Sequence, residues 1–154
     1  PWNATAADLP DDIQQMTDML TALRKQPFVV PMLVVRDSRI IALATTGLAN
    51  VRHLNAYYIA LFDDLEGVDL GLRMHIRHVF WSVPLHRLQL QVPVVSGSER
   101  YMEMLERVGF EREGTLKDHV MIGGAPCDIA AFGLLRSDVE QWAGAFEPRL
   151  RLTP

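Results

Sequence analysis

Hydrophobic positions along this chain switch between helical spacing and short apolar runs. Apolar side chains recur every three or four residues over 13–23 and again over 72–80, which predicts two amphipathic helices. Runs rich in valine, isoleucine and leucine predict strands over 28–35, 40–48, 54–62, 87–92 and 127–135. Strands before and after a helix indicate an α/β domain whose sheet is mostly antiparallel.

Residues that favour caps and turns set the limits of these elements. Asp8 is a good N-cap for the first helix, and Pro27 ends it. Asp37-Ser38-Arg39 joins the first two strands as a hairpin turn. The second helix is expected from about 69 to 82, before Pro84 stops it. The C-terminal tail over 144–154 is expected to fray.

The segment over 96–128 carries the most detailed local signals. Ser96 and Glu99 have the spacing of a capping box, which predicts the start of a third helix. Gly109 stands where a helix favours a left-handed residue at its end. Between these limits, the apolar face of the helix consists of Met102, Leu105 and Val108.

Composition limits the class of protein. The chain has 154 residues, 49% of them hydrophobic, which is enough for one globular domain spanning 1–154. No apolar run approaches the roughly 20 residues of a membrane span, and no basic-then-apolar leader precedes the first helix. A net charge of −4 argues against a nucleic-acid surface. One cysteine, Cys127, excludes an internal disulfide and agrees with a reducing cytosol.

The C-terminal half contains a recognisable motif. Gly109-Phe110 is followed by Glu113-Gly114, a predicted hairpin tip at Gly123-Gly124, and Asp128. This G-F-x-x-E-G run followed by G-x-x-x-D resembles the C-terminal half of GNAT-family acyltransferases. The branch it resembles most is that of the ribosomal-protein N-terminal acetyltransferases. The resemblance is strong from about 80 to 135 and weak before it.

The resemblance implies a GNAT-like mixed sheet flanked by helices, with two central strands that splay apart. In the family, the pantetheine arm of acyl-CoA lies in the gap between them. Pro93 follows one of these strands and lacks a backbone donor, which fits a splay as well as it fits an edge strand. The family layout begins with a further strand and helix, but here there is room only for the helix. Either the N-terminus is truncated or that strand is supplied otherwise.

The expected phosphate-binding junction departs from the family pattern. Family members bind the CoA pyrophosphate at a strand-to-helix turn reading Q/R-x-x-G-x-G/A, where glycines and a helix N-terminus offer backbone donors. Gly67 and Gly71 remain as candidate cradle residues, but Glu66 and Asp69 stand where Gln or Arg and glycine belong. Each carboxylate close to a phosphate costs about 4 kcal/mol before screening. The alternative is a solvated acidic helix cap.

The catalytic tyrosine of the family is also displaced. Its position, on the helix before Gly109, is occupied by Leu105, which has no proton to give. The Asn-x-x-Ser pattern of the sister branch falls on Ser98 and Tyr101, and Tyr101 lies one turn before Leu105 on the same face. We therefore hypothesise that Tyr101, with Ser98 or an ordered water, protonates the leaving thiolate. The alternative for Tyr101 is a half-buried packing aromatic.

Candidate bases and donor-binding residues complete the expected site. Asp63 and Asp64 end the strand that lines the cleft, and either could accept the amine proton directly or through water. As plain surface acids they need no such role. By resemblance, the residues expected to bind acyl-CoA are Leu61, Phe62, Glu66, Gly67, Val68, Gly71, Ser98, Tyr101 and Leu105.

Other reactive side chains favour ordinary roles. His75 and His78 could share a metal with His86, but no fourth ligand has suitable spacing, so we expect a solvated helix face and no metal. Cys127 lacks a paired histidine motif and is expected to be a small buried side chain.

The resemblance therefore implies an N-acyltransferase that moves an acetyl or other acyl group from acyl-CoA to a primary amine. The acceptor is a protein N-terminus or a small molecule. The rival hypothesis is a GNAT scaffold without turnover that binds a partner, a ligand or its own copy. The acidic junction, Leu105 and the missing first strand favour it. No nucleic-acid or membrane partner is expected, and the predicted location is the cytoplasm. A homodimer is a family expectation that an open sheet edge would encourage.

Overall fold

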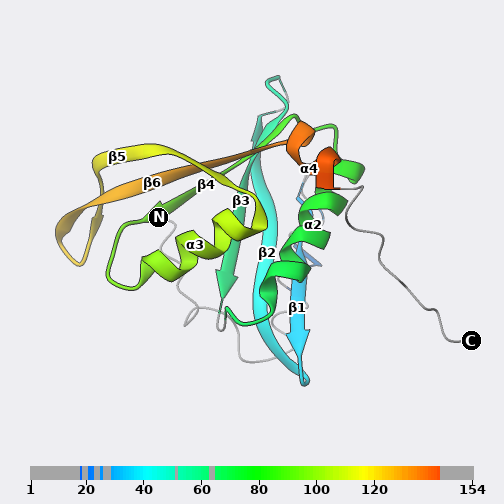
Figure 1. Ribbon diagram of the computed structural model, residues 1–154, viewed down its shortest axis with the longest axis horizontal. Helices are drawn as coiled ribbons and strands as arrows, with labels where there is room; N and C mark the ends of the chain where they lie inside the picture. The colour runs from blue at the N-terminus through cyan, green and yellow to red at the C-terminus, as the bar shows by residue number, and fades with distance from the viewer. Residues whose placement is uncertain are drawn as a thin grey trace, which may run out of the picture.

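One six-stranded sheet runs through the molecule, with helices packed on it (Figure 1). The computed structural model describes residues 18, 21–22, 25, 29–50, 52–62 and 65–142. The strands are β1 (Met32–Arg36), β2 (Arg39–Asn50), β3 (Asn55–Phe62), β4 (Arg87–Pro93), β5 (Glu111–Ile122) and β6 (Ala125–Leu135). The helices include α2 (Val68–Ser82), α3 (Ser98–Val108) and α4 (Arg136–Trp142).

The strand order is β1-β2-β3-β4-β6-β5. Strands β3 and β4 are parallel, and the other neighbouring pairs are antiparallel. The predicted α/β fold with a mostly antiparallel mixed sheet is therefore confirmed.

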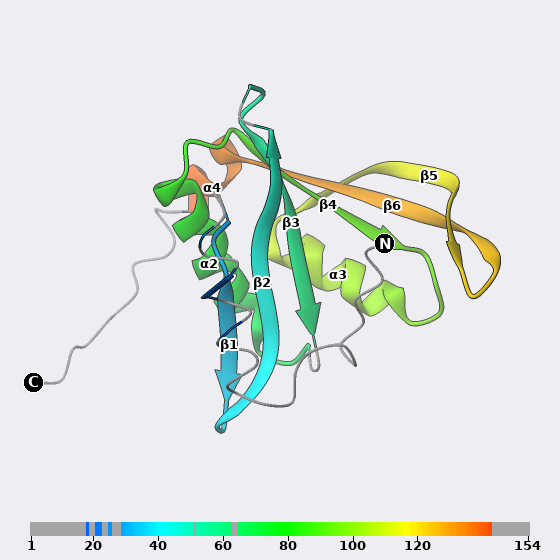
Figure 2. The same cartoon turned by 180° about the vertical axis from the view of Figure 1, so that it is seen from behind.

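Helices α2 and α3 cover the same face of the sheet, as the front and back views show (Figures 1 and 2). Because side chains alternate along a strand, every second residue of β3 and β4 points into this helical layer. The strand residues buried there are Ala56, Tyr58, Ala60, Leu88, Leu90 and Val92. They pack against Leu72, Ile76, Val79 and Phe80 of α2 and against Met102, Leu105 and Val108 of α3. The helix faces expected from the apolar spacing are therefore the core-facing ones.

Positive backbone φ angles mark the predicted turns. Asp37 and Ser38 have φ of 49° and 62°, as a two-residue hairpin turn with two left-handed positions requires. Gly109 has φ of 113° and ends α3 in the left-handed region. Gly123 and Gly124, with φ of 59° and 82°, form the tip of the β5–β6 hairpin.

Helix α3 begins later than the capping-box spacing predicted. Its N-cap is Gly97, in the left-handed region, and no side chain caps it. The Glu99 carboxylate accepts a hydrogen bond from the Gly97 N–H (3.1 Å), so it reaches back to Gly97 and not to Ser96. The expected start at Ser96 is therefore wrong, because the chain makes a left-handed turn before entering the helix.

Several predictions concern positions outside the described residues. These are the start of the first helix at Asp8, the candidate bases Asp63 and Asp64, the tail over 144–154, and the first strand of the family layout. Among the residues that are described, no helix has the length and apolarity needed to cross a bilayer.

Candidate active site

Strands β3 and β4 pair only along their first halves. Their register covers three residue pairs, of which Tyr57 with Gln89 is the last, although β3 continues to Phe62 and β4 to Pro93. Strand β4 stays paired with β6 along its whole length, down to Pro93 with Ile129. The two central strands therefore part beyond Tyr57, as Figure 2 shows, and the expected splay is present.

Backbone groups of β3 face the space between the parted strands. Near the closed end of the pair, the Arg87 N–H donates to Leu54 O (3.2 Å). The backbone N–H and C=O groups of alternate residues point to the same side of a strand. Because Leu54 O faces β4, the even-numbered residues of β3 also direct their N–H and C=O groups toward β4. Ala60 and Phe62 share this orientation and lie beyond the last pair. Their N–H groups therefore point into the gap.

Pro93 sits where its missing donor does no harm. The Val94 N–H donates to Asp128 O on β6 (2.9 Å), so Pro93, one residue earlier, turns its backbone toward β3. There the strands have already parted, and no ladder bond is lost. Pro93 is thus compatible with the splay for a local geometric reason.

The Tyr101 hydroxyl enters the gap from α3. It donates a hydrogen bond to Ala60 O (3.3 Å). The Tyr101 ring lies against the Phe62 ring, with centroids 5.2 Å apart and planes tilted by 55°. Burial raises the pKa of Tyr101 above its usual value of 10.0, so the phenol stays protonated at neutral pH. The structure thus brings together two of the predicted residues, Tyr101 and Phe62, and makes Tyr101 a hydrogen-bond donor.

Ser98 supplies an unpartnered hydroxyl one turn before Tyr101. Its residue exposure is 8%, and its Oγ has no hydrogen-bond partner within the described part of the chain. A buried hydroxyl usually has a partner, and leaving one without costs about 1–3 kcal/mol. Residues three apart share a helix face, so Ser98 and Tyr101 lie on the same side of α3. This hydroxyl therefore marks a place where a ligand group or a water would be stabilised.

The junction between β3 and α2 is open around Gly67. This residue is the N-cap of α2, with φ of 73°, and a Cβ built on it would meet no atom of the described residues within 4 Å. Glu66 before it has an 87% exposed side chain. Arg36 Nη1 donates to Glu66 O (2.9 Å) and lies 4.0 Å from its carboxylate. Val68 after it is fully buried, so its side chain faces the core. The junction therefore has both an exposed carboxylate and an arginine close to it.

Two other residues of the junction have clear structural contacts. A Cβ on Gly71 would lie 2.9 Å from Val34 Cγ2, so glycine lets α2 approach β1 closely. The Asp69 carboxylate accepts a hydrogen bond from Arg107 Nε on α3 (3.1 Å). These contacts account for glycine and aspartate at the two positions without a phosphate. The ion pair also reduces the negative charge expected at this end of α2.

The remaining predicted residues are scattered around the gap. Leu105 is fully buried in the core. Leu61 is half-buried and, as an odd-numbered residue of β3, points to the other face of the sheet. Asp63 lies outside the described residues. Phe62 and Tyr101 thus meet at the parted strands, with Ser98 one helical turn before Tyr101, while Leu105 packs in the core and Leu61 points to the other face of the sheet.

Comparison with solved structures identifies the architecture. Spermidine N-acetyltransferase from Vibrio cholerae, in complex with CoA and spermine, is similar with a TM-score of 0.68 and 17% identity, over 85% of this chain and 79% of that one. The ribosomal-protein-S5-alanine acetyltransferase from Vibrio fischeri has a TM-score of 0.69 and 20% identity, over 90% of this chain and 78% of that one. No protein-family model and no curated protein sequence matches the chain.

This protein has the GNAT fold. The prediction from the motif after Gly109 is confirmed at the level of the fold. Because identity is at most 20% in these matches, the chemistry has to be argued from the residues of this chain.

The residues at this site suit the thioester arm of acyl-CoA better than its pyrophosphate. The gap suits a thioester arm, since the N–H groups of Ala60 and Phe62 point into it, and Ser98, one turn before Tyr101, has a hydroxyl without a partner among the described residues. The junction suits the pyrophosphate less well. Gly67 leaves its backbone accessible and Arg36 adds positive charge, but the exposed Glu66 carboxylate opposes an anion.

A closed set of buried hydrogen bonds, called the Tyr58–His75 ring below, lies near the point where β3 and β4 part. The Tyr58 hydroxyl donates to His75 Nδ1 (2.9 Å), and His75 Nε2 donates to Val30 O (2.7 Å). The Val30 N–H donates to Thr46 Oγ1 (2.9 Å), and Thr46 is the cross-strand partner of Tyr58. Because a carbonyl can only accept, Nε2 carries the imidazole proton and Nδ1 is the acceptor. Burial lowers the pKa of His75 to about 4, so the imidazole is neutral at pH 7.

The placement of His75 corrects the sequence prediction. His75 was expected on a solvated face of α2, but its exposure is 2%. The signal that identifies it is its spacing, three residues after Leu72 and four before Val79, which puts it in the apolar stripe. Within the described residues, no group of three or more His, Cys, Asp or Glu side chains could hold a metal ion. Sequence reasoning also missed Ala60, because its backbone and not its side chain faces the gap.

Proposed function

We propose that this protein transfers an acetyl group from acetyl-CoA to a primary amine. The observation that carries the proposal is the parting of β3 and β4, with the Ala60 and Phe62 N–H groups and the Tyr101 hydroxyl directed into one gap. The printed names of two fold neighbours support an amine acceptor, since one is a spermidine acetyltransferase and the other a ribosomal-protein alanine acetyltransferase.

In the proposed reaction, the nitrogen lone pair of a neutral amine attacks the thioester carbonyl. The C–N bond forms, and negative charge develops on the carbonyl oxygen. A backbone N–H of β3 that faces the gap, from Ala60 or Phe62, stabilises this charge. The tetrahedral intermediate then loses a proton from nitrogen and expels the CoA thiolate, which leaves an amide and, after protonation, a free thiol.

Tyr101 assists the leaving sulfur as a hydrogen-bond donor. Burial raises the pKa of Tyr101 above 10.0. A thiol has a pKa of about 8.5, so complete proton transfer from this phenol to the thiolate would be uphill by about 2 kcal/mol or more. A hydrogen bond from the phenol avoids this proton transfer, and to form it the hydroxyl turns its single proton from Ala60 O to the sulfur. The thiolate then takes its proton from solvent or from the amine, and the Ser98 hydroxyl, directly or through a water, is a second donor to sulfur.

The proton released by the amine goes to a base or to water. Asp63, the residue after Phe62, remains our proposed base. It follows the strand whose N–H groups face the gap, which is the correct end of β3 for this role.

Turnover tests the proposal. The protein is incubated with acetyl-CoA and a panel of amines that contains spermidine, lysine and peptides with N-terminal alanine or serine. Free thiol is measured together with the mass of the acetylated product. We expect an acetylated product from at least one amine. No product from any of them, together with no binding of acetyl-CoA, would contradict the proposed function.

A second measurement tests Tyr101 itself. Tyr101→Phe is expected to lower kcat by roughly 10- to 100-fold, at or below the lower limit for general acid catalysis, because the phenol donates a hydrogen bond without complete proton transfer. Tyr57→Phe is the matched control, because it removes a phenol from the opposite face of β3. Undiminished kcat in Tyr101→Phe would refute the role of this hydroxyl and leave the function standing.

The rival function is a GNAT scaffold that binds without turnover. The observation that favours it is the exposed Glu66 carboxylate at the junction expected to hold phosphates. Thermal unfolding with and without acetyl-CoA separates the two, because a ligand at 100 times its Kd adds about 2.7 kcal/mol to the free energy of unfolding. Absence of any shift at millimolar acetyl-CoA would favour the rival.

Assembly and location are part of the same proposal. We propose a homodimer in the cytoplasm, supported by the single cysteine and by the free edge that β1 presents within the described sheet. Light scattering on the purified chain measures the oligomeric state, and a monomer at micromolar concentration would contradict the dimer.

A further inference from the structure

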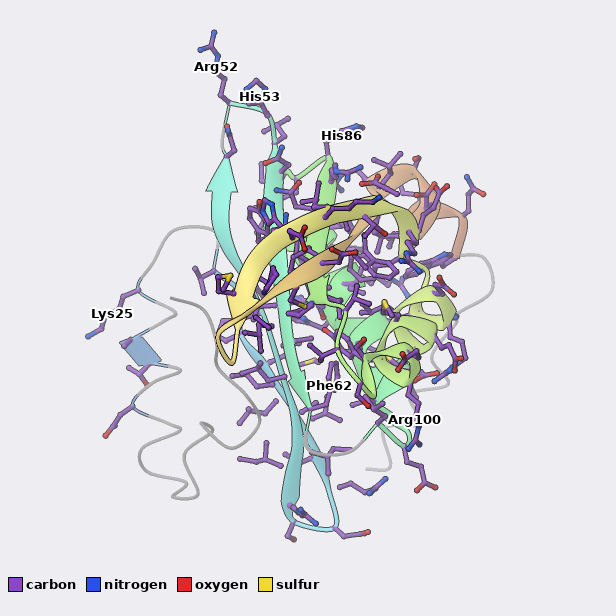
Figure 3. The ribbon with its side chains drawn as sticks, turned by 90° about the vertical axis from the view of Figure 1, so that its left-hand side faces the viewer. Lys25, Arg52, His53, Phe62, His86 and Arg100 are labelled. Carbon is purple, nitrogen blue, oxygen red and sulfur yellow. The ribbon has the colours of Figure 1, made fainter. Side chains whose placement is uncertain are left out.

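An open cavity lies at the closed end of the β3–β4 pair, away from the candidate active site. Its volume is about 520 Å³. The residues that matter for its chemistry are Leu54, Phe80, Trp81, Leu85, His86 and Arg136. Leu54 precedes Ala60 by six residues of extended chain, which separates the cavity from the gap by about 20 Å. In Figure 3, His86 and Phe62 lie toward opposite ends of the sheet, so the two sites are distinct.

Arg136 is held rigidly at the edge of this cavity. Its Nε donates to Leu85 O (2.8 Å) and its Nη2 to Val83 O (2.9 Å). Its guanidinium also lies over the Phe80 ring, 5.3 Å from the centroid. Within the described residues, Nη1 makes no hydrogen bond and Arg136 has no acidic partner. A guanidinium fixed on three sides with donors to spare is preorganised to bind an anion.

Trp81 forms an exposed aromatic wall of the same cavity. Its exposure is 83%, the highest of the large hydrophobic residues on the described surface. An indole ring left in water at the rim of a concave site provides a face for stacking another apolar ring. Leu54, which is 42% exposed, is a further apolar surface.

The charge of the lining is one-sided. His86 and Arg136 contribute to it, and none of the described residues that line the cavity is Asp or Glu. Figure 3 also shows Arg52 and His53 at this end of the molecule, near His86. This is notable because the whole chain has a net charge of −4. A negatively charged group meets no like charge here, while a cation finds no partner.

A structural role alone explains only part of the arrangement. Arg136 satisfies carbonyl groups just after the end of α2, which stabilises that helix end. That role does not use Nη1, and it does not require Trp81 to remain exposed beside a cavity. The structural role therefore does not account for the Nη1 donors of Arg136 or for the exposed indole of Trp81.

We propose that this cavity binds an apolar, preferably aromatic, molecule that carries one carboxylate or similar anionic group. The ring stacks on Trp81 and lies against Leu54, while the anionic group accepts hydrogen bonds from Arg136 Nη1, with His86 beside it. The site is independent of the proposed acetyl transfer.

The test uses three small probes and follows the tryptophan indole N–H resonances of the full chain by NMR. The probes are 2-naphthoate, its neutral analogue 2-naphthalenemethanol, and acetate. For a probe of this size we expect 2-naphthoate to saturate with a Kd of about 1 mM. The neutral analogue should bind roughly fivefold more weakly, since it cannot form a charge-assisted hydrogen bond, and acetate should not saturate.

Variants test which side chains are responsible. Trp81→Ala should weaken 2-naphthoate binding about tenfold, and His86→Ala should weaken it less. Because both side chains are exposed, neither change should disturb the fold. Met74→Ala is the matched control, since Met74 is a 54% exposed apolar residue of α2 outside the cavity. For these variants binding is followed by the probe signals.

Three results would overturn the proposal. The first is the absence of saturable binding of 2-naphthoate up to about ten times the expected Kd. The second is equal binding of the neutral analogue, which would mean that the anion is not recognised. The third is an equal effect of Trp81→Ala and Met74→Ala, which would place the probe elsewhere.

Discussion

The β3–β4 pair is held in different ways at its two ends. At the closed end, β4 is tied to β3 by the backbone bond from Arg87 to Leu54 and to β5 by an ion pair from Arg87 to Glu113. The Arg87–Glu113 pair uses both guanidinium Nη atoms and passes over Gly133 of β6. At the open end, the contacts of α3 with β3 include the Tyr101–Ala60 hydrogen bond and the contact between the Tyr101 and Phe62 rings.

Under the proposed function, this difference separates stability from ligand binding within a single strand pair. Backbone groups at the closed end are used by the sheet, while those of Ala60 and Phe62 face the gap. A fully satisfied buried network such as the Tyr58–His75 ring makes its surroundings rigid. We therefore expect substitutions at the closed end to change the free energy of unfolding, and substitutions at the open end to change the affinity for acetyl-CoA.

The largest effect is expected from breaking the buried ring. His75→Ala removes the acceptor of the Tyr58 hydroxyl and the donor to Val30 O, and it leaves a cavity. Two buried polar groups without partners, plus the lost volume, should lower the free energy of unfolding by about 4 kcal/mol. Urea unfolding measures the loss. His78→Ala, an exposed change one turn along α2, is the control and should cost less than about 0.5 kcal/mol.

Lowering the pH should weaken the same ring without a substitution. Burial lowers the pKa of His75 to about 4 from 6.5, so between these values the unfolded chain binds a proton that the folded chain does not. The stabilisation is therefore complete above pH 6.5 and is lost as the pH falls toward 4. From pH 7 to about 4.5 the loss should be roughly 2–3 kcal/mol. The measurement is the difference in unfolding free energy between wild type and His75→Ala, and a difference constant with pH would contradict the assignment.

The ion pair at the closed end should contribute less. A Cβ on Gly133 would meet the Glu113 carboxylate and lie 2.6 Å from Arg87 Nη2, so Gly133→Ala should push the pair apart. Because the Glu113 side chain is 40% exposed, solvent screening limits the expected cost to about 1 kcal/mol. Glu113→Gln should cost a similar amount. In the double variant the two costs should not add, and additive costs would show that Gly133 acts through something other than this pair.

Sequence patterns predicted local features of the fold better than contacts between residues far apart in the chain. The elements, the turn at Asp37-Ser38 and the glycine stop at Gly109 follow from local spacing, so the sequence alone is sufficient to find them. The start of α3 was missed because Gly97 and Ser96 offer competing local turns, and spacing cannot rank them. The Arg87–Glu113 pair joins residues 26 apart through β6, which no local pattern encodes.

The candidate site was predicted in part for a similar reason. Tyr101 and Phe62 could be assigned from a motif and a helical period, and the structure brings them together. The backbone orientation of Ala60 depends on the register with β4, which is set only when the sheet forms. Gly71 matched a phosphate motif in the sequence, yet its close contact is with Val34, a residue 37 positions away.

The smallest expected effect on stability, and one of opposite sign, is at the open end. Ser98→Ala removes a buried hydroxyl that has no partner in the described structure, so the free energy of unfolding without ligand should rise, by up to about 1 kcal/mol. If this hydroxyl meets the acyl-CoA arm, the same variant should bind acetyl-CoA several-fold more weakly. Urea unfolding and calorimetric titration measure the two quantities. If the variant loses stability, the hydroxyl stabilises the fold. If the variant gains stability and keeps its affinity for acetyl-CoA, the hydroxyl has no role in binding. A hydroxyl that binds the ligand should lower stability when acetyl-CoA is absent and raise affinity when it is present.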